Sequence, residues 1–257
     1  MWRTSQWTPV ALASLQVTFP TGATTLAAPK MKSRIFLLSL LIGAAITLAG
    51  QACSPPQRTA GPCSPPQGVS GSPNRVEDVV SLLNSLPKPV TVACFLQSLD
   101  RPLELIASTS SASAQPSPHP SSPRLFIFKG DLVITVVPEG SSGEIVEFST
   151  RISQTRSVKA ELDFPVTETL DPAAPYNKIR SGTGTSCRFC HSSESRHSAI
   201  SFAEAFESEI IWPNPSSLVP LSQLSLLHQY CNSDSERCEV FSGIFDHGPV
   251  RQRGLPY

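Results

Sequence analysis

The chain has no excess of basic residues and carries no net charge. Its 257 residues contain 20 Lys and Arg and 20 Asp and Glu, so the formal charge at pH 7 is zero. Residues 1–52 hold four of the basic side chains and no acidic one, which leaves a net charge of about −4 on the remainder. Nucleic-acid-binding proteins need a basic surface for the phosphate backbone. The composition therefore argues against a nucleic-acid partner.

The N-terminal region lacks a hydrophobic run long enough to cross a bilayer. Its apolar stretch, residues 35–49, has about 15 residues, whereas a spanning helix needs roughly 20. Lys32 and Arg34 come directly before this stretch. A basic segment followed by a short apolar segment is typical of a secretory signal peptide, so we expect the chain to be exported. The alternative interpretation is a buried helix.

The leader has two parts of different character. Residues 1–30 show no comparable order, which indicates that translation starts at Met31. The leader is then residues 1–52, with the signal peptide at 31–52. We expect the rest of the chain to reside at the periplasmic face of a bacterial membrane.

Cys53 directly follows the leader and opens a proline-rich stretch, residues 53–73. Without apolar periodicity, this stretch is expected to be an extended, solvated tether. A cysteine at the head of such a tether resembles the diacylglyceryl cysteine of bacterial lipoproteins, which implies a lipid anchor at Cys53. Of the three residues before it, Ala52 matches the lipobox of that family well. Ordinary cleavage after Ala49 or Ala52 would instead release a soluble periplasmic protein.

Residues 74–170 are expected to form a helix followed by a β-rich domain. Apolar residues recur at helical spacing at Val76, Val79, Val80, Leu83 and Leu86. Apolar or alternating stretches then predict strands at residues 89–95, 103–108, 125–128, 132–137, 143–149 and 157–166. The turn residues Lys129-Gly130-Asp131 between the third and fourth of these stretches predict a hairpin. Five or six strands at this spacing predict a small antiparallel β-sandwich or barrel.

The remaining region, residues 171–257, is expected to be short and mostly helical. Helices are predicted at residues 220–231 and 235–247, and the last ends before Gly248. Residues 201–212 could form a helix or a strand, and we favour the helix. The predicted fold class is therefore α+β.

The sequence Cys187-Arg188-Phe189-Cys190-His191 resembles the haem-attachment site of c-type cytochromes. Two thiols three positions apart can reach the two vinyl groups of one haem and form thioethers. The resemblance implies one haem c, bound covalently through Cys187 and Cys190, with His191 as the proximal iron ligand. Export agrees with this reading because c-type maturation occurs outside the cytoplasm. A compact helical cytochrome fold is not expected, because the motif follows a long β-rich region.

The sixth iron ligand cannot be a methionine, because Met1 and Met31 both lie in the leader. The His/Met pair of many cytochromes c is therefore excluded. The sixth position is left to a histidine, to another donor such as lysine, or to no protein ligand. Among the histidines we predict His228, on an expected helix, and after it His247.

Cys231 and Cys238 enclose a short polar loop between two expected helices. In an oxidising compartment, a disulfide between them is the simplest interpretation, and it would clamp a small region with little core. A pairing of Cys63 with Cys94 is possible.

Two alternatives compete with haem for the motif. Cys187 and Cys190 could form a redox disulfide, although the strand–helix context of thioredoxin-like motifs is absent. They could also bind zinc together with Cys231 and Cys238, although the spacing of the second pair is too wide for a usual zinc knuckle.

Two functions follow from these alternatives. The first is electron transfer by a monohaem protein at a membrane face, with a redox partner protein. The second is a β-rich structural or ligand-binding lipoprotein whose CxxC is a disulfide or a zinc site. A haem enzyme ranks behind both, because spacing assigns no acid/base pair.

Overall fold

The computed structural model describes residues 63–140, 143–231 and 235–255. The predicted signal peptide and the predicted lipidated Cys53 lie outside the described residues. Within the described ranges, no helix combines the length and the hydropathy that a membrane span requires.

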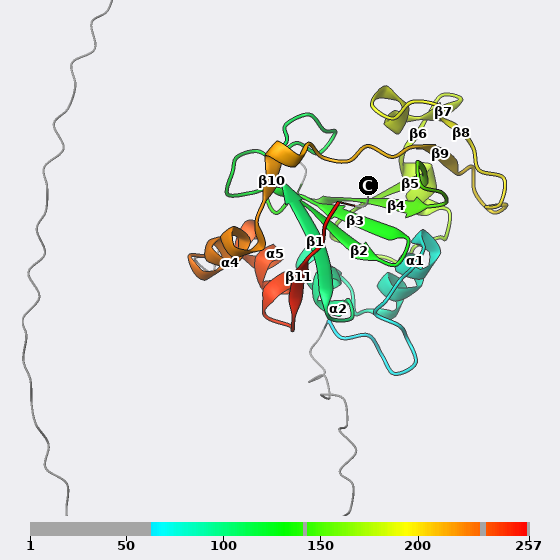
Figure 1. Ribbon diagram of the computed structural model, residues 1–257. Helices are drawn as coiled ribbons and strands as arrows, with labels where there is room; N and C mark the ends of the chain where they lie inside the picture. Colours follow the sequence, from blue (N-terminus) through cyan, green and yellow to red (C-terminus); the bar gives the residue numbers. More distant parts are fainter. Residues whose placement is uncertain (1–62, 141–142, 232–234, 256–257) are drawn as a thin grey trace, which may run out of the picture. The chain divides into compact units, whose positions relative to one another are not determined.

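Nine strands from the described residues form one mixed sheet (Figure 1). The strand order is β10-β1-β2-β3-β4-β5-β9-β8, and β11 runs parallel to β1. The strands of this sheet are β1 (Leu103–Ser108), β2 (Arg124–Lys129), β3 (Leu132–Val136), β4 (Ile145–Arg151), β5 (Arg156–Asp163), β8 (Ser195–Arg196), β9 (Phe206–Glu209), β10 (Leu218–Val219) and β11 (Val250–Gln252). A separate hairpin consists of β6 (Arg180–Ser181) and β7 (Gly184–Thr185).

Strands β1 to β5 form an antiparallel meander, in which alternate residues face a buried core. The hairpin predicted around Lys129-Gly130-Asp131 joins β2 to β3, with Lys129 opposite Leu132. Gly130 has a φ of +59°, a left-handed conformation that glycine adopts without steric cost. Local turn chemistry and alternation therefore determine this part of the fold.

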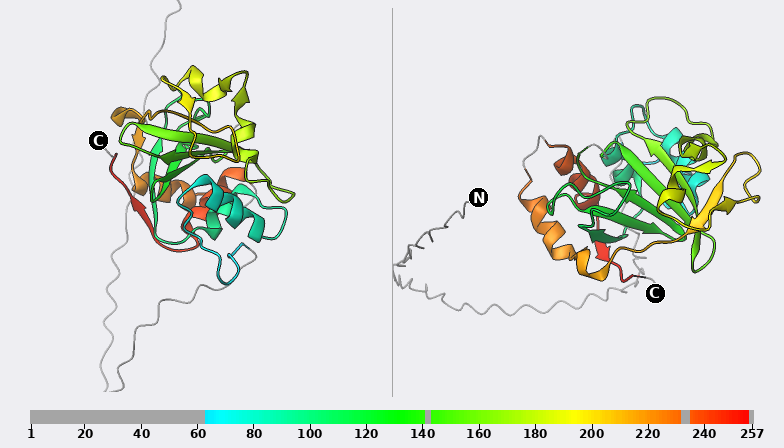
Figure 2. Two further views of the ribbon diagram at one scale, coloured as in Figure 1. Left: turned by 90° about the vertical axis from the view of Figure 1, so that its right-hand side faces the viewer. Right: turned by 90° about the horizontal axis from the view of Figure 1, so that it is seen from above.

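Helices cover one face of the sheet and supply the other half of the core (Figure 2). The helices are α1 (Val76–Ser85), α2 (Val92–Ser98), α3 (Ala174–Lys178), α4 (Leu221–Gln229) and α5 (Glu236–Phe245), with the 3-10 turns η1 (Ser186–Phe189) and η2 (Pro215–Ser217). Leu83 of α1 and Phe95 of α2 are fully buried in the same apolar cluster as Ile127 and Ile134 of the sheet. The α+β class predicted from the sequence is thus confirmed.

The strand predicted at residues 89–95 is wrong, because most of this segment belongs to helix α2. Thr91 caps the helix, since its hydroxyl accepts a hydrogen bond from Cys94 N at 3.1 Å. Phe95 and Leu96 are fully buried against the sheet. A short apolar run has no periodicity that separates a buried strand from a buried helix, so the packing partner decides.

A sandwich or barrel followed by a helical region is not what the structure contains. Strands β8 to β11 come from residues 171–257 and join the same sheet as β1 to β5. Within the helix predicted at residues 201–212, Phe206–Glu209 is strand β9, which pairs antiparallel with β5. The polar backbone edge of β5 thereby gains hydrogen-bond partners that a helix could not offer.

The C-terminal part of the predicted tether packs on the domain. Cys63 forms a disulfide with Cys94 of α2. Asp100 N donates to Gly71 O at 2.7 Å, and both Gly71 and Pro73 are buried. Residues 63–73 are therefore part of the folded unit and not a solvated tether.

Helix α5 packs closely on α2 at Gly243. A Cβ at this position would lie 2.6 Å from the carbonyl oxygen of Ala93, which is backbone and cannot rotate away. We expect Gly243→Ala to lower the free energy of unfolding by about 1–3 kcal/mol, as overpacking does in well-packed cores. Without the contact, alanine would stabilise the helix by about 1 kcal/mol. The sign of the change in the free energy of unfolding therefore shows whether the two helices are in contact at this position.

Urea unfolding followed by circular dichroism measures this change. The matched control is Glu239→Ala on the exposed side of the same helix, which should change stability by less than about 0.5 kcal/mol. A stabilised Gly243→Ala protein would show that α5 and α2 are not in close contact.

Candidate functional site

The sheet face opposite the helices is the floor of a cavity of about 380 Å³. On strands β2 to β5, residues that alternate with the core positions point to this side. The floor residues are Arg124, Phe126, Phe128, Val133, Thr135, Glu147, Ser149, Ser157, Lys159 and Glu161. The volume lies in the range of about 300–1,000 Å³ that small-molecule and cofactor sites occupy.

Three segments line the cavity beside this floor: part of residues 110–114, which follow β1, part of residues 179–191, which precede β8, and residues 210–214, which follow β9. The last belongs to the connection from β9 to β10, which crosses from the β5 side of the sheet to the β1 side (Figure 1). Trp212 in this connection stacks on Phe128, with ring centroids 6.3 Å apart. The Arg253 guanidinium lies 4.6 Å from the centroid of the Phe128 ring. Aromatic surface therefore lines the β2 side of the cavity.

The Cys-x-x-Cys-His motif lies on a short, well-anchored segment. Thr185, at the end of the β6–β7 hairpin, accepts a hydrogen bond from Cys187 N at 3.2 Å and so caps η1. Glu194 accepts hydrogen bonds from Thr185 N, at 2.9 Å, and from the Thr185 hydroxyl. Gly184 leaves room for this carboxylate, because a Cβ there would clash with it. Gly184 thus allows the contact between Glu194 and Thr185 that anchors the motif.

Cys187, Cys190 and His191 all line the cavity. His191 Nδ1 lies 2.7 Å from Glu209 O and donates to it, which leaves the lone pair of Nε2 available. Burial, and then the charge of Lys159, lower the pKa of His191 to about 4. The imidazole is therefore neutral at pH 7, as a metal ligand must be.

Cys187 and Cys190 are free thiols, whereas the other four described cysteines form two disulfides. Burial raises the pKa of Cys187 to about 11, although the hydrogen bond with Thr185 acts in the opposite direction. At pH 7 the sulfur is a neutral thiol, which is a poor nucleophile for disulfide exchange. The raised pKa of Cys187 therefore gives no support to a redox disulfide.

The floor carries buried charges close to the motif. Arg124 forms an ion pair with Glu147. Burial, and then the charge of Glu147 directly across the β4–β5 ladder, raise the pKa of Glu161. Lys159 is 7% exposed, and burial lowers its pKa to about 8. The sheet thus supplies an amine and two carboxylates to the space that the motif lines.

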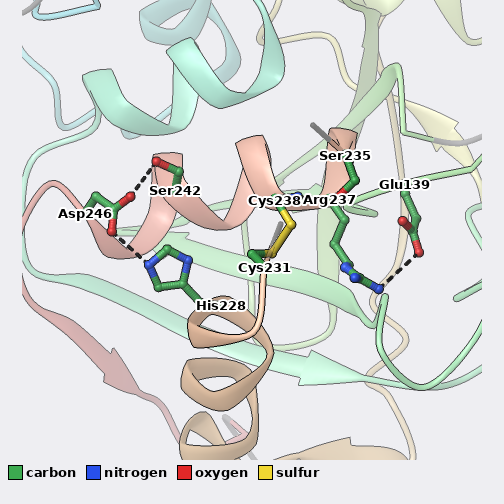
Figure 3. The surroundings of a disulfide bond; sticks show 8 residues. All are labelled: Glu139, His228, Cys231, Ser235, Arg237, Cys238, Ser242 and Asp246. Atoms are coloured by element: carbon green, nitrogen blue, oxygen red, sulfur yellow. Dashed lines mark hydrogen bonds and ion pairs between the residues drawn. A yellow bond between two sulfur atoms is a disulfide. The ribbon is translucent and has the colours of Figure 1, made fainter. Parts of the chain in front are cut away.

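His228, the sixth ligand predicted from the sequence, does not line this cavity. It lies on α4, where Nε2 is 2.8 Å from Asp246 Oδ1 at the end of α5 (Figure 3). Its ring stacks on Phe245 with a centroid distance of 5.3 Å. The Cys231–Cys238 disulfide lies beside it. The pairing of α4 with α5 therefore holds His228 away from the motif, and the assignment is corrected.

The other histidines also have partners elsewhere. His119 pairs with Glu139 at 2.5 Å, and His197 pairs with Glu207 at 2.5 Å. His247, the second choice from the sequence, lines a separate pocket beside the two disulfides. Among the described residues that line the cavity on the sheet, His191 is the one histidine.

The four-cysteine zinc alternative does not assemble. Cys231 and Cys238 are bonded to each other, so they cannot join Cys187 and Cys190 as thiolate ligands. Residues 63–140, 143–231 and 235–255 contain no group of three or more His, Cys, Asp or Glu placed to hold a metal ion.

Sequence reasoning missed the floor residues Arg124, Glu147 and Lys159. Each alternates with core residues on its strand, and from alternation alone such positions are expected to face solvent. The signal that could have found them is the presence of both charge signs on the non-core face of adjacent strands. What covers that face is decided by the distant connection from β9 to β10.

Comparison of the chain with protein-family models, with curated proteins and with solved structures found no match.

Proposed function

We propose that the protein binds one haem c through Cys187 and Cys190, with His191 as the proximal ligand, and that it transfers single electrons. The observation that carries this proposal is the convergence of two free thiols and a neutral imidazole on one cavity. These are the groups, in the order along the chain, that covalent haem attachment requires.

The residues present fit a haem. The thiols can form thioethers with its vinyl groups, and the Nε2 lone pair of His191 can ligate the iron, because Nδ1 is held by Glu209 O. Phe126, Phe128 and Trp212 supply an apolar lining that excludes water from a flat macrocycle. Haem, when bound, supplies one-electron chemistry at its iron.

Electron exchange with a partner needs a path from the cofactor to the surface. Cys190 is exposed, and the neighbouring Phe189 is 80% exposed. A haem attached at Cys190 would therefore have one edge at the protein surface, where a redox partner protein could approach. This arrangement supports electron transfer over chemistry in an enclosed site.

Export and anchoring are parts of the same proposal. The signal peptide at residues 31–52 would deliver the chain to the compartment in which haem c is attached. Lipidation at Cys53 would hold the haem domain at the periplasmic face of the membrane.

The proposal is tested by expressing the chain from Met31, with its own signal, in a bacterium that matures c-type cytochromes. We expect one haem per chain in the pyridine haemochrome spectrum, a mass gain of one haem, and a reversible one-electron titration. A haem-free chain under these conditions, with or without a Cys187–Cys190 disulfide, would contradict haem attachment.

A second candidate function rests on the cavity alone. Its volume of about 380 Å³ and its lining of aromatic and charged side chains also suit a small organic ligand bound without haem. The chain would then be a β-rich ligand-binding lipoprotein. A haem-free product in the experiment above would favour this alternative.

A further inference from the structure

Lys159 is a buried lysine on the cavity floor that the proposed haem attachment leaves without a role. It is 7% exposed, and its Nζ donates to Ser157 Oγ at 2.7 Å and to Ser149 Oγ at 3.3 Å. Within the described parts of the chain, it forms no ion pair with a carboxylate. Burial of an ammonium group is costly, and the nearby Glu147 carboxylate offsets only part of that cost, so a partner that uses the neutral amine is favoured here.

Few side chains on this cavity could occupy the sixth position of a haem iron. The guanidinium groups of Arg124, Arg151 and Arg253 stay protonated and offer no lone pair. The carboxylates of Glu147 and Asp131 are held by ion pairs with Arg124 and Arg151. The Glu161 carboxylate would be a weak-field ligand that leaves a ferric haem high-spin, which the experiment below distinguishes from an amine. The described residues that line the cavity include neither a methionine nor a second histidine. Lys159 is the one amine among them.

Lys159 and His191 reach the cavity from different elements. Lys159 projects from β5 in the floor, whereas His191 follows η1 and is held beside the end of β9 by Glu209 O. Both side chains line the same cavity. The amine of Lys159 on the sheet would therefore face a haem that the motif holds in the same cavity.

We propose that Lys159 Nζ is the sixth ligand of the haem iron, an inference that rests on the proposed haem attachment. Ligation uses the amine lone pair, so the ammonium group releases one proton to water, and no electron is exchanged. Ser157 and Ser149 can still accept hydrogen bonds from the remaining N–H groups and so orient the lone pair. Two nitrogen ligands, His191 and Lys159, would leave the iron no open position for a substrate, which would suit an electron carrier.

The experiment compares haem-loaded wild type with Lys159→Leu, which removes the amine and offers the iron no other ligand. Electronic absorption and electron paramagnetic resonance of the ferric proteins report the spin state. We expect a low-spin iron in the wild type and a high-spin iron in Lys159→Leu, with rapid CO binding to the ferrous variant. Nitrogen hyperfine coupling in wild type labelled with ¹⁵N-lysine tests ligation without any substitution.

Lys129→Leu is the matched control. Lys129 is also a buried lysine of this sheet, at 9% exposure, but its Nζ donates to Asp100 O and it does not line the cavity. Its spectrum should match the wild type. A haem-loaded wild type that is high-spin, or an unchanged low-spin Lys159→Leu, would overturn Lys159 ligation while leaving haem attachment intact. Failure of the wild type to bind haem would instead remove the proposed function on which the inference rests.

Discussion

Replacing Cys187 and Cys190 together by serine should abolish covalent haem, so that the purified chain shows no haem stain after denaturing electrophoresis. The expected loss is complete, because a hydroxyl group cannot form the thioether that a thiol forms with a vinyl group. Each single replacement should leave one thioether and an altered haemochrome spectrum. The measurements are the pyridine haemochrome spectrum and the intact mass of the protein.

The disulfide cysteines provide the control for this prediction. The double variant Cys231→Ser, Cys238→Ser removes two cysteines from the same chain but leaves both thiols on the cavity. It should retain one covalent haem at full stoichiometry. Covalent haem in the variant that lacks Cys187 and Cys190 would show that the motif is not the attachment site.

The second large effect concerns stability. Phe95→Ala should lower the free energy of unfolding by about 3–5 kcal/mol, as truncation of a buried phenylalanine does. Phe95 is fully buried, and its ring centroid lies 6.3 Å from that of Phe148 on β4 and 5.7 Å from that of Phe164. The lost ring would leave a cavity between α2 and the sheet that the meander cannot close. Urea unfolding, monitored by circular dichroism, measures the change.

Phe189→Ala is the matched control for Phe95→Ala. Phe189 is 80% exposed, so its truncation should change stability by less than about 0.5 kcal/mol. It occupies a spacer position of the motif, so haem attachment should also persist. A Phe95→Ala protein as stable as Phe189→Ala would show that α2 does not pack on the sheet as described.

The effect on haem attachment and the effect on stability should be separable, because the residues concerned lie on opposite faces of the sheet. Phe95 acts on the helix-covered face, whereas Cys187 and Cys190 lie over the other. Haem-loaded Phe95→Ala should therefore unfold at lower urea concentration but keep the absorption spectrum of the wild type while folded.

Much of the regular structure could be predicted from local pattern. The helix expected at residues 76–86 is α1, and the strand expected at residues 103–108 is β1. The hairpin around Gly130 and the two C-terminal helices also lie where periodicity and turn residues put them. In each case the signal comes from neighbours in sequence, because amphipathic spacing and a glycine turn act over a few residues.

The failures share a different cause. Residues 89–95 and 201–212 are short apolar or mixed runs that suit a helix or a strand about equally. The first became α2, because Thr91 caps a helix and Phe95 packs on the sheet. The second became β9, because the edge of β5 was available for pairing. Partners distant in sequence decided both.

The sequence by itself determined the Cys-x-x-Cys-His motif, because Cys187, Cys190 and His191 lie within five consecutive residues whose spacing is set by local chain geometry. Only the tertiary structure decided what surrounds that motif. In the folded chain, His228 on α4 pairs with Asp246 and lies away from the motif. Lys159 on β5 lines the same cavity as the motif. The physical reason is that the cavity is made of alternate side chains on four strands and of a connection that crosses them, and no local spacing encodes that assembly.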